Sequence, residues 1–232
     1  MVRPEVKTVS AFELVVFDMD GVLVDSEILA CGCLREALGR HGVALELEEV
    51  FDHFLGRSFS AVEDDFRRRT GAPLPTGFAT ELNALLVARY QTALRVMPDA
   101  KRLLRGLRAP CCVASSSSLE RIRLSLGLTA LAPFFGANIF NTSMVARGKP
   151  APDLFLFAAE RMGARPDRTL VIEDSVSGVL AGKAAGMTVW GFVGGGHYTG
   201  RDASGMLANA GADRIVERMA DLLPYLSEAA PP

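Results

Sequence analysis

The sequence predicts an α/β fold in which a doubly wound parallel sheet carries an all-helical domain inserted after its first strand. Three observations indicate this class: short apolar runs recur along the chain, helical patterns separate most of them, and residues 26–96 contain no convincing strand. Strands that alternate with helices form βαβ units and a parallel sheet. We therefore expect a Rossmann-like core of residues 1–25 and 97–232 and a helical domain of residues 26–96.

The expected strands are short and continuously apolar, as is typical of a parallel sheet covered on both faces. The first run is Leu14–Phe17, which contains two β-branched residues and ends at an acidic loop. Five more strands are expected at 111–114, 137–140, 169–172, 188–193 and 214–216, of which the last is weakly marked.

Helices are expected where apolar residues recur at helical spacing behind a capping residue. Ser118, Asp153 and Ser175 are each expected to begin a helix of the core, and Gly186 is expected just after the third one ends. Pro98 is expected to open the helix that follows the inserted domain. Inside that domain, helices are expected at 27–40, 46–55, 60–70 and 77–95, with the Gly- and Pro-rich segment 71–77 as a linker.

Composition and charge exclude several classes of protein. Hydrophobic residues make up 49% of the 232 residues and charged residues 22%, which excludes a disordered chain. The 25 basic and 27 acidic residues give a net charge of −2, without the basic excess of a nucleic-acid-binding protein. No apolar run approaches the ~20 residues that span a bilayer, and the first ten residues lack the apolar stretch of a signal peptide. We expect a cytoplasmic enzyme with no nucleic-acid or membrane partner.

The four cysteines stand in two close pairs, Cys31 with Cys33 and Cys111 with Cys112. This arrangement is not a secreted disulfide framework, and it lacks the C-x₂-C or histidine spacing of a zinc site. We expect structural, unreactive thiols.

Two carboxylates, Asp18 and Asp20, follow the first expected strand directly. In an extended stretch their side chains point the same way, and they repel each other unless a cation or a proton joins them. Gly21 lets the backbone turn sharply and approach a ligand. The carboxyl end of such a strand is where open α/β sheets bind ligands, although a solvated acidic turn that caps a helix is the alternative interpretation.

A second acidic pair, Glu173 and Asp174, follows the expected strand at 169–172. Carboxylates from two strand ends can converge on one hard cation, and Mg²⁺ favours oxygen ligands. Simple capping of the next helix by Asp174 and Ser175 is the alternative.

Two further segments have groups that suit an anion. Lys149 stands between Gly148 and a proline, so its head can neutralise an anion on an acidic site; a surface lysine is the alternative. The four serines at 115–118 precede a helix and supply hydroxyl and backbone N–H donors, which is typical of a phosphate cradle or of an ordinary polar loop.

Four motifs occur in a fixed order: D-x-D-G-x-x-x-D-S at 18–26, V-A-S-S at 113–116, G-K-P-x-P-D at 148–153 and I-E-D-S-x-x-G at 172–178. Together they resemble the haloacid dehalogenase superfamily, in the branch of β-phosphoglucomutases and of phosphoglycolate and sugar-phosphate phosphatases. The resemblance covers about residues 12–226, and the four motifs together are specific where each alone is not. The chain looks most like bacterial sugar-phosphate phosphatases, including those acting on 6-phosphogluconate.

The resemblance implies roles for the matching residues. Asp18 would be the nucleophile that forms an aspartyl-phosphate, and Asp20 the general acid and base. Ser115, Ser116 and Lys149 would hold the phosphoryl oxygens and stabilise the charge of the transition state.

The resemblance also implies a Mg²⁺ cofactor, held by Asp18, the backbone carbonyl of Asp20, and Asp174, with Glu173 close by. The helical residues 26–96 would form a cap that closes over the site and excludes water. Arg57, in a glycine-led turn of that cap, would reach a carboxylate or hydroxyl of the substrate; an exposed loop arginine is the alternative.

Among the activities of such a family, the residues favour a phosphatase acting on a small phosphorylated metabolite, a sugar phosphate or sugar-acid phosphate. A dehalogenase would lack the second aspartate, which is present here as Asp20. A β-phosphoglucomutase would add a histidine after the first motif and a Lys-Asn pair in the second, both absent; its cap arginine is at best displaced to Arg57, with Arg121 as a possible substitute.

Two other expectations remain open. A non-catalytic protein that binds a phosphorylated metabolite is the third alternative, disfavoured because the carboxylates and Lys149 are all intact. No stretch offers a clear self-pairing face, and family members of this size are often monomers, so we expect a monomer. The segment 194–197, Gly-Gly-Gly-His, follows an expected strand at the edge of the site and has no assigned mechanism.

Overall fold

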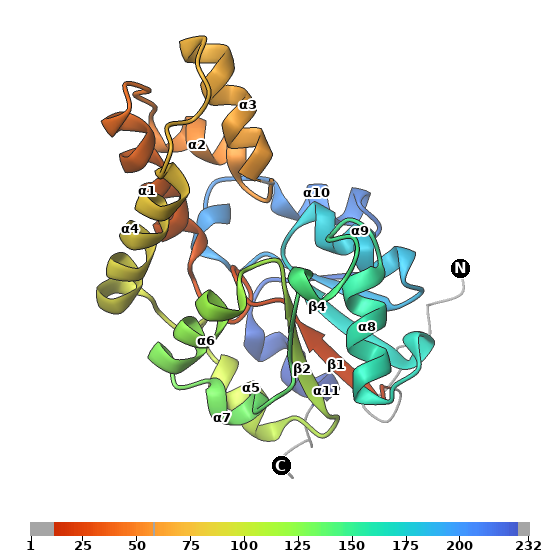
Figure 1. Ribbon diagram of the computed structural model, residues 1–232. Helices are drawn as coiled ribbons and strands as arrows, with labels where there is room; N and C mark the ends of the chain where they lie inside the picture. Colours follow the sequence, from red (N-terminus) through yellow and green to blue (C-terminus); the bar gives the residue numbers. More distant parts are fainter. Residues whose placement is uncertain (1–11, 58, 227–232) are drawn as a thin grey trace.

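The computed structural model describes residues 12–57 and 59–226 (Figure 1). Its centre is a six-stranded sheet in the order β3-β2-β1-β4-β5-β6, and every neighbouring pair is parallel. The strands are β1 Leu14–Phe17, β2 Cys111–Ser115, β3 Ile139–Asn141, β4 Thr169–Glu173, β5 Thr188–Phe192 and β6 Arg214–Val216. The predicted doubly wound parallel sheet is confirmed. Successive strands are added on one side from β1 to β3 and on the other side from β4 to β6, so the strand order switches between β1 and β4.

Alternate residues of the strands face opposite sides of the sheet, and each side is covered by helices. Val15 and Phe17 of β1 pack in one apolar cluster, whereas Leu14 and Val16 pack in another. The first cluster includes residues of α5 Ala100–Gly106, α6 Leu119–Leu128, α7 Ala132–Phe135 and α11 Leu223–Leu226. The second includes residues of α8 Asp153–Met162, α9 Val176–Ala184 and α10 Ala203–Asn209.

Most helix ends in the core agree with the capping residues in the sequence. Ser118 caps α6 by accepting from the backbone N–H of Arg121, and Ser175 caps α9 by accepting from that of Gly178. Gly186, after α9, has a positive φ of 73°, as a C′ glycine does. Short 3₁₀ turns complete the connections: η2 Thr142–Met144, η3 Pro166–Arg168, η4 Gly196–Tyr198 and η5 Met219–Leu222.

Two elements of the core begin two residues later than the sequence predicts. The third strand begins at Ile139 rather than at 137, because Asn138 and Ile139 donate their N–H groups to local turn carbonyls. Helix α5 begins at Ala100 rather than at Pro98, because its N-cap residue Asp99 adopts a left-handed conformation with φ 61°.

Four helices occupy the interval between β1 and α5: α1 Glu27–Arg40, α2 Leu47–Phe54, α3 Phe59–Thr70 and α4 Phe78–Ala93. Buried apolar side chains from all of α1, α2 and α3, together with Phe78 of α4, form a third cluster separate from the two that flank the sheet. Figure 1 shows these helices gathered at one end of the molecule, away from α7 and α11.

The two chain segments that connect these helices to the sheet lie side by side. Met97 donates its backbone N–H to Leu23 at 2.9 Å, and Asp25 donates to Arg95 at 3.0 Å. An isolated antiparallel bridge between Val24 and Val96 joins them as well. No helix within the described residues is long and apolar enough to cross a membrane.

Candidate active site

The predicted site residues converge at the carboxyl ends of β1 and β4, which are neighbours in the sheet. Phe17 pairs with Ile172 in the ladder, so Asp18 and Glu173 follow at adjacent positions. The backbone N–H of Asp18 also donates to the carbonyl of Ile172 at 3.0 Å. This edge is the topological switch point, where the strand order changes direction and where open α/β sheets bind ligands.

The turn after β1 requires glycine at position 21. Gly21 has φ 74°, and a Cβ built there would lie 1.8 Å from Oδ2 of Asp174. The backbone of the first motif therefore lies directly against the carboxylate of the fourth. Asp18 is only 7% exposed, which excludes the alternative of a solvated acidic turn.

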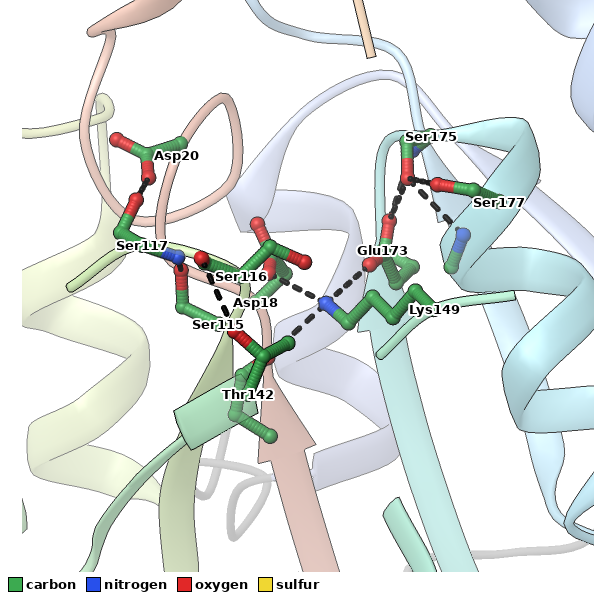
Figure 2. Close-up of polar contacts among 12 residues, drawn as sticks. Asp18, Asp20, Ser115, Ser116, Ser117, Thr142, Lys149, Glu173, Ser175 and Ser177 are labelled. Atoms are coloured by element: carbon green, nitrogen blue, oxygen red, sulfur yellow. Dashed lines mark hydrogen bonds and ion pairs between the residues drawn. The ribbon is translucent and has the colours of Figure 1, made fainter. Parts of the chain in front are cut away.

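Lys149 connects the two strand ends. Its Nζ donates to Oδ1 of Asp18 at 2.6 Å and to Oε1 of Glu173 at 2.6 Å, as Figure 2 shows. It also donates to the carbonyl of Ala114 at 3.0 Å. Its side chain is 4% exposed, so it is not a surface lysine. Burial alone would lower the pKa of Lys149, but the two carboxylates outweigh that effect and raise it. The ammonium therefore stays charged.

Glu173 is engaged through both carboxylate oxygens. Oε1 accepts from Lys149, while Oε2 accepts from the backbone N–H of Ser175 at 2.8 Å and from its hydroxyl at 2.9 Å. A Cβ at Gly178, in the first turn of α9, would lie 1.8 Å from Oε1. These contacts orient Lys149 and the start of α9, which favours a positioning role for Glu173 over that of a metal ligand.

Burial and nearby carboxylates disfavour the ionised forms of Asp18 and Asp174 when no cation is bound. Burial, followed by repulsion from Glu173 and other neighbouring carboxylates, raises the pKa of Asp174 well above its usual range. Burial likewise raises the pKa of Asp18, and Lys149 opposes this only in part. His197 Nε2 lies 3.3 Å from Oδ2 of Asp174, but burial lowers the pKa of that imidazole and so favours its neutral form.

This donor set fits a hard divalent cation. Asp18 and Asp174 line the same cavity with carboxylate oxygens, and the family resemblance adds the backbone carbonyl of Asp20, with no sulfur among these donors. No group of three or more His, Cys, Asp or Glu side chains among the described residues is arranged to hold a metal by itself. Two carboxylates and one carbonyl suit Mg²⁺, which keeps several waters in its coordination shell.

The carboxylate of Asp20 accepts hydrogen bonds from two serine hydroxyl groups rather than from Lys149. Its Oδ1 accepts from Ser26 at 2.6 Å and its Oδ2 accepts from Ser117 at 2.5 Å, as Figure 2 shows for the second contact. Arg121 donates through Nε to the Ser117 hydroxyl at 3.0 Å and lies 3.9 Å from the Asp20 carboxylate. Ser26, Ser117 and Glu27 are site residues that the sequence motifs do not predict, although Ser26 ends the first motif and Ser117 lies in the serine run at 115–118.

The serine loop after β2 faces the same space. Ser115 is buried, and its hydroxyl accepts from the backbone N–H of Ser117 at 3.1 Å. Ser116 is exposed, and its carbonyl accepts from the hydroxyl of Thr142 at 3.4 Å. Both serines line the cavity beside Asp18 and Lys149.

A cavity of about 760 Å³ lies between these loops and helices α1 to α4. Arg57 and Arg121 line it, and so does Glu27, whose pKa is raised to about 8 by burial and by Asp20 and Asp174. On the side of the inserted helices its wall is mainly apolar, with Ala30, Cys31, Leu34, Phe54, Phe59, Val62, Leu82 and Leu86. Arg57 is thus brought to the site by its turn.

A parallel α/β core with a helical insertion, and carboxylates facing a buried lysine at its switch point, define a class of hydrolases. The sequence model of the haloacid dehalogenase-like hydrolase family matches residues 12–186 of this chain. The chain belongs to this family and is a phosphoric monoester hydrolase.

Relatives with known names and structures agree with this assignment. The 6-phosphogluconate phosphatase of Escherichia coli (strain K12) is 32% identical over 184 residues, which cover 79% of this chain and 83% of that one. A haloacid dehalogenase-like protein of unknown function from Agrobacterium tumefaciens superposes with a TM-score of 0.80 at 35% identity, covering 91% of this chain and 96% of the other. A family hydrolase from Deinococcus radiodurans, solved with bound phosphate and sodium, has a TM-score of 0.75 at 36% identity over 91% and 93%.

Proposed function

We propose that this chain is a Mg²⁺-dependent phosphatase that hydrolyses a small phosphorylated metabolite, a sugar phosphate or a sugar-acid phosphate. One observation carries the proposal: the buried Lys149 ammonium touches Asp18 at 2.6 Å beside a serine loop that lines the same cavity. A phosphoryl group seated there meets a carboxylate nucleophile, a fixed cation and hydroxyl donors. The named 6-phosphogluconate phosphatase among the relatives supports a sugar-acid phosphate as substrate.

In the proposed first step, a carboxylate oxygen of Asp18 attacks phosphorus and the ester P–O bond breaks. Asp20 gives its proton to the leaving oxygen. In the second step Asp20 takes a proton from a water molecule, and that water attacks the phosphorus of the aspartyl-phosphate. Inorganic phosphate leaves and Asp18 is restored.

The charged groups of the site serve these steps. Lys149 and Ser115, with Ser116, hold the phosphoryl oxygens and stabilise charge that grows on them. Glu173 keeps Lys149 in place. When Mg²⁺ is bound, by Asp18, Asp174 and the carbonyl of Asp20, it supplies positive charge that offsets repulsion between the nucleophile and its anionic target.

Residues 26–96 act as the cap over this site, with residues 1–25 and 97–232 as the catalytic core. The 760 Å³ cavity between the two parts supports this division. Arg57 contacts the leaving group from the cap side. The protein acts in the cytoplasm as a monomer on a small metabolite, without a nucleic-acid or membrane partner.

A phosphosugar mutase is the second candidate. It is favoured by one observation, that two guanidinium groups, Arg57 and Arg121, line the cavity and can hold the second phosphate of a bisphosphate. Against it stands the absence of the histidine and Lys-Asn pair noted in the sequence.

Asp18→Asn tests the phosphatase proposal. We expect turnover to fall by at least about 10³-fold, because an amide cannot attack phosphorus, while the thermal midpoint stays at or above that of the wild type. Asp167→Asn, at an exposed ion pair, is the control and should retain full activity. Chelation of Mg²⁺ should stop the wild-type reaction.

Phosphate release is measured on phosphorylated sugars, sugar acids, phosphoglycolate and β-glucose 1-phosphate with Mg²⁺ present. Wild-type rates in Asp18→Asn would refute the central assignment. Isomerisation of β-glucose 1-phosphate without phosphate release would establish the mutase instead, and no turnover of any ester would favour a binding protein.

A further inference from the structure

Arg201 joins the core to one face of cap helix α2. Its guanidinium donates to Oδ1 of Asp52 at 2.8 Å and to Oε2 of Glu48 at 3.2 Å, and its Cζ lies 5.1 Å from the ring centre of Phe51. Positions 48, 51 and 52 lie on one side of a helix because they are three and four residues apart. One side chain of the core thus contacts three residues on one turn of α2.

The segment that carries Arg201 is attached firmly to the edge of the catalytic site. The hydroxyl of Tyr198 donates to the backbone carbonyl of Asp174, and the N–H of Gly196 donates to Oδ1 of Asp25 at 3.1 Å. The backbone N–H of Arg201 in turn donates to the carbonyl of Tyr198 at 3.0 Å. Arg201 therefore projects from a base that is fixed relative to Asp174.

The three glycines before this segment allow that close attachment. A Cβ at Gly194 would lie 2.4 Å from the carbonyl oxygen of Glu217, and one at Gly196 would lie 2.8 Å from Ile28. Side chains at either position would push the segment away from the core and from the start of α1. This explains the glycine run for which the sequence alone offered no mechanism.

Helix α2 leads straight into the turn that reaches the active site. It ends at Phe54, and after Leu55 come Gly56 and Arg57, which line the catalytic cavity. The N–H of Arg57 donates to the carbonyl of Phe54 at 3.0 Å, which ties the turn to the helix end. A shift of α2 relative to the core therefore moves Arg57 relative to Asp18 and Lys149.

Space remains between cap and core beside this contact. A second cavity of about 530 Å³ is lined by Phe51 and Leu55 on the cap side and by Leu180 and Met206 on the core side. Leu180 is 44% exposed and Met206 50%. An approach of α2 would cover these apolar side chains, and burial of apolar surface favours such an approach.

We propose that Arg201 is a positioning residue that clamps α2 and so sets the cap orientation from which Arg57 meets the leaving group. The inference rests on the proposed phosphatase function for its kinetic consequence. Arg201 touches none of the reacting groups. Exposed ion pairs contribute little to folding stability, so this clamp can open and re-form as the cap moves without unfolding the protein.

The test measures cap position and kinetics in Arg201→Gln. Spin labels on Glu63→Cys in α3 and Glu160→Cys in α8, both exposed positions, report the distance between cap and core. We expect the distance distribution to broaden. We also expect KM for the best ester of the panel to rise ~5–10-fold while kcat changes less than ~2-fold, the scale of two exposed ion pairs and a stacked guanidinium.

Two further variants separate positioning from general damage. Arg165→Gln removes an exposed arginine that pairs with Asp167 on the core, and it should leave distances and KM unchanged. Asp52→Asn should reproduce part of the Arg201→Gln effect, and the exchanged pair Arg201→Asp with Asp52→Arg should recover part of it. Recovery by exchange would show that the contact between positions 201 and 52 produces the effect.

An unchanged distance distribution in Arg201→Gln would overturn the clamp, as would a changed distribution with an unchanged KM. If the wild type releases phosphate from no ester, the phosphatase proposal fails. The distance measurement still decides whether Arg201 holds the cap, because it needs no turnover.

Discussion

Lys149 shows how one side chain joins motifs that are far apart in the sequence. It contacts Asp18, 131 residues earlier, and Glu173, 24 residues later, each at 2.6 Å. Removing the lysine would leave two buried carboxylates without their cation, and an uncompensated buried charge costs about 3–5 kcal/mol. The residue therefore holds the site together in addition to facing the phosphoryl group.

Glu27 adds a pH dependence to the stability of this site. Burial, followed by repulsion from Asp20 and Asp174, raises its pKa from 4.5 to about 8 in the folded chain. Below pH 4.5 the carboxyl is protonated in both the folded and the unfolded state. As pH rises towards 8, the unfolded chain ionises this group first, so the metal-free fold loses stability.

Glu27→Gln should remove that loss, because the amide stays neutral at every pH. Without Mg²⁺, we expect the thermal midpoint of the variant to equal that of the wild type near pH 4.5 and to exceed it increasingly up to about pH 8. Calorimetric scans across this range, with Glu63→Gln at an exposed cap position as control, measure the difference. A constant difference at all pH values would contradict the assignment.

Among the elements, α9 is placed by a glycine that no side chain can replace. Gly178 lies where a Cβ would come 1.8 Å from the Glu173 carboxylate, although the helix itself would accept alanine. The close approach of α9 to β4 lets Glu173 receive Ser175 on one oxygen and Lys149 on the other. The packing of α9 against β4 therefore also fixes the orientation of Lys149, through Glu173.

Gly178→Ala should lower both stability and activity. Overpacking of this kind costs about 1–3 kcal/mol, and the displaced Glu173 would release Lys149, so we expect kcat to fall by at least about 10-fold. Gly32→Ala is the matched control, because nothing lies within 4 Å of its added Cβ in α1. It should stabilise the protein by about 0.5–1 kcal/mol without changing kcat. Denaturant unfolding and initial rates compare the two.

Across the whole molecule, burial raises the pKa of all four thiols, which lowers the fraction of reactive thiolate. Burial raises the pKa of Cys31 to about 12 and that of Cys111 to about 11. It also raises the pKa values of Cys33 and Cys112. None of the four is paired in a disulfide. This agrees with the structural role that the sequence predicts for them.

Alkylation therefore reports the integrity of both cap and core. Cys31 and Cys33 lie in the cap and Cys111 and Cys112 in the sheet, so iodoacetamide at pH 8 should modify each at least about 100-fold more slowly in the native protein than in urea. Mass spectrometry of time points follows the four sites separately. Rapid modification of the cap pair alone would mean that the cap opens locally.

Local patterns in the sequence were sufficient for the fold class and for the class of enzyme. Apolar runs with β-branched residues marked the strands, and the acidic pairs marked the two strand ends that meet. Asp18 and Glu173 come together because neighbouring parallel strands end at the same edge, a consequence that follows from strand prediction and sheet topology alone.

Contacts that depend on packing between distant segments left no such pattern. The hydroxyl of Ser117 on Asp20, the place of Glu27 in the cavity and the grip of Arg201 on α2 each join segments with no shared periodicity. The sequence predicts Glu173 at a metal site because residue type indicates which bonds a carboxylate can make. Which bonds it does make depends on the side chains that folding brings within 3 Å, here Lys149 and Ser175.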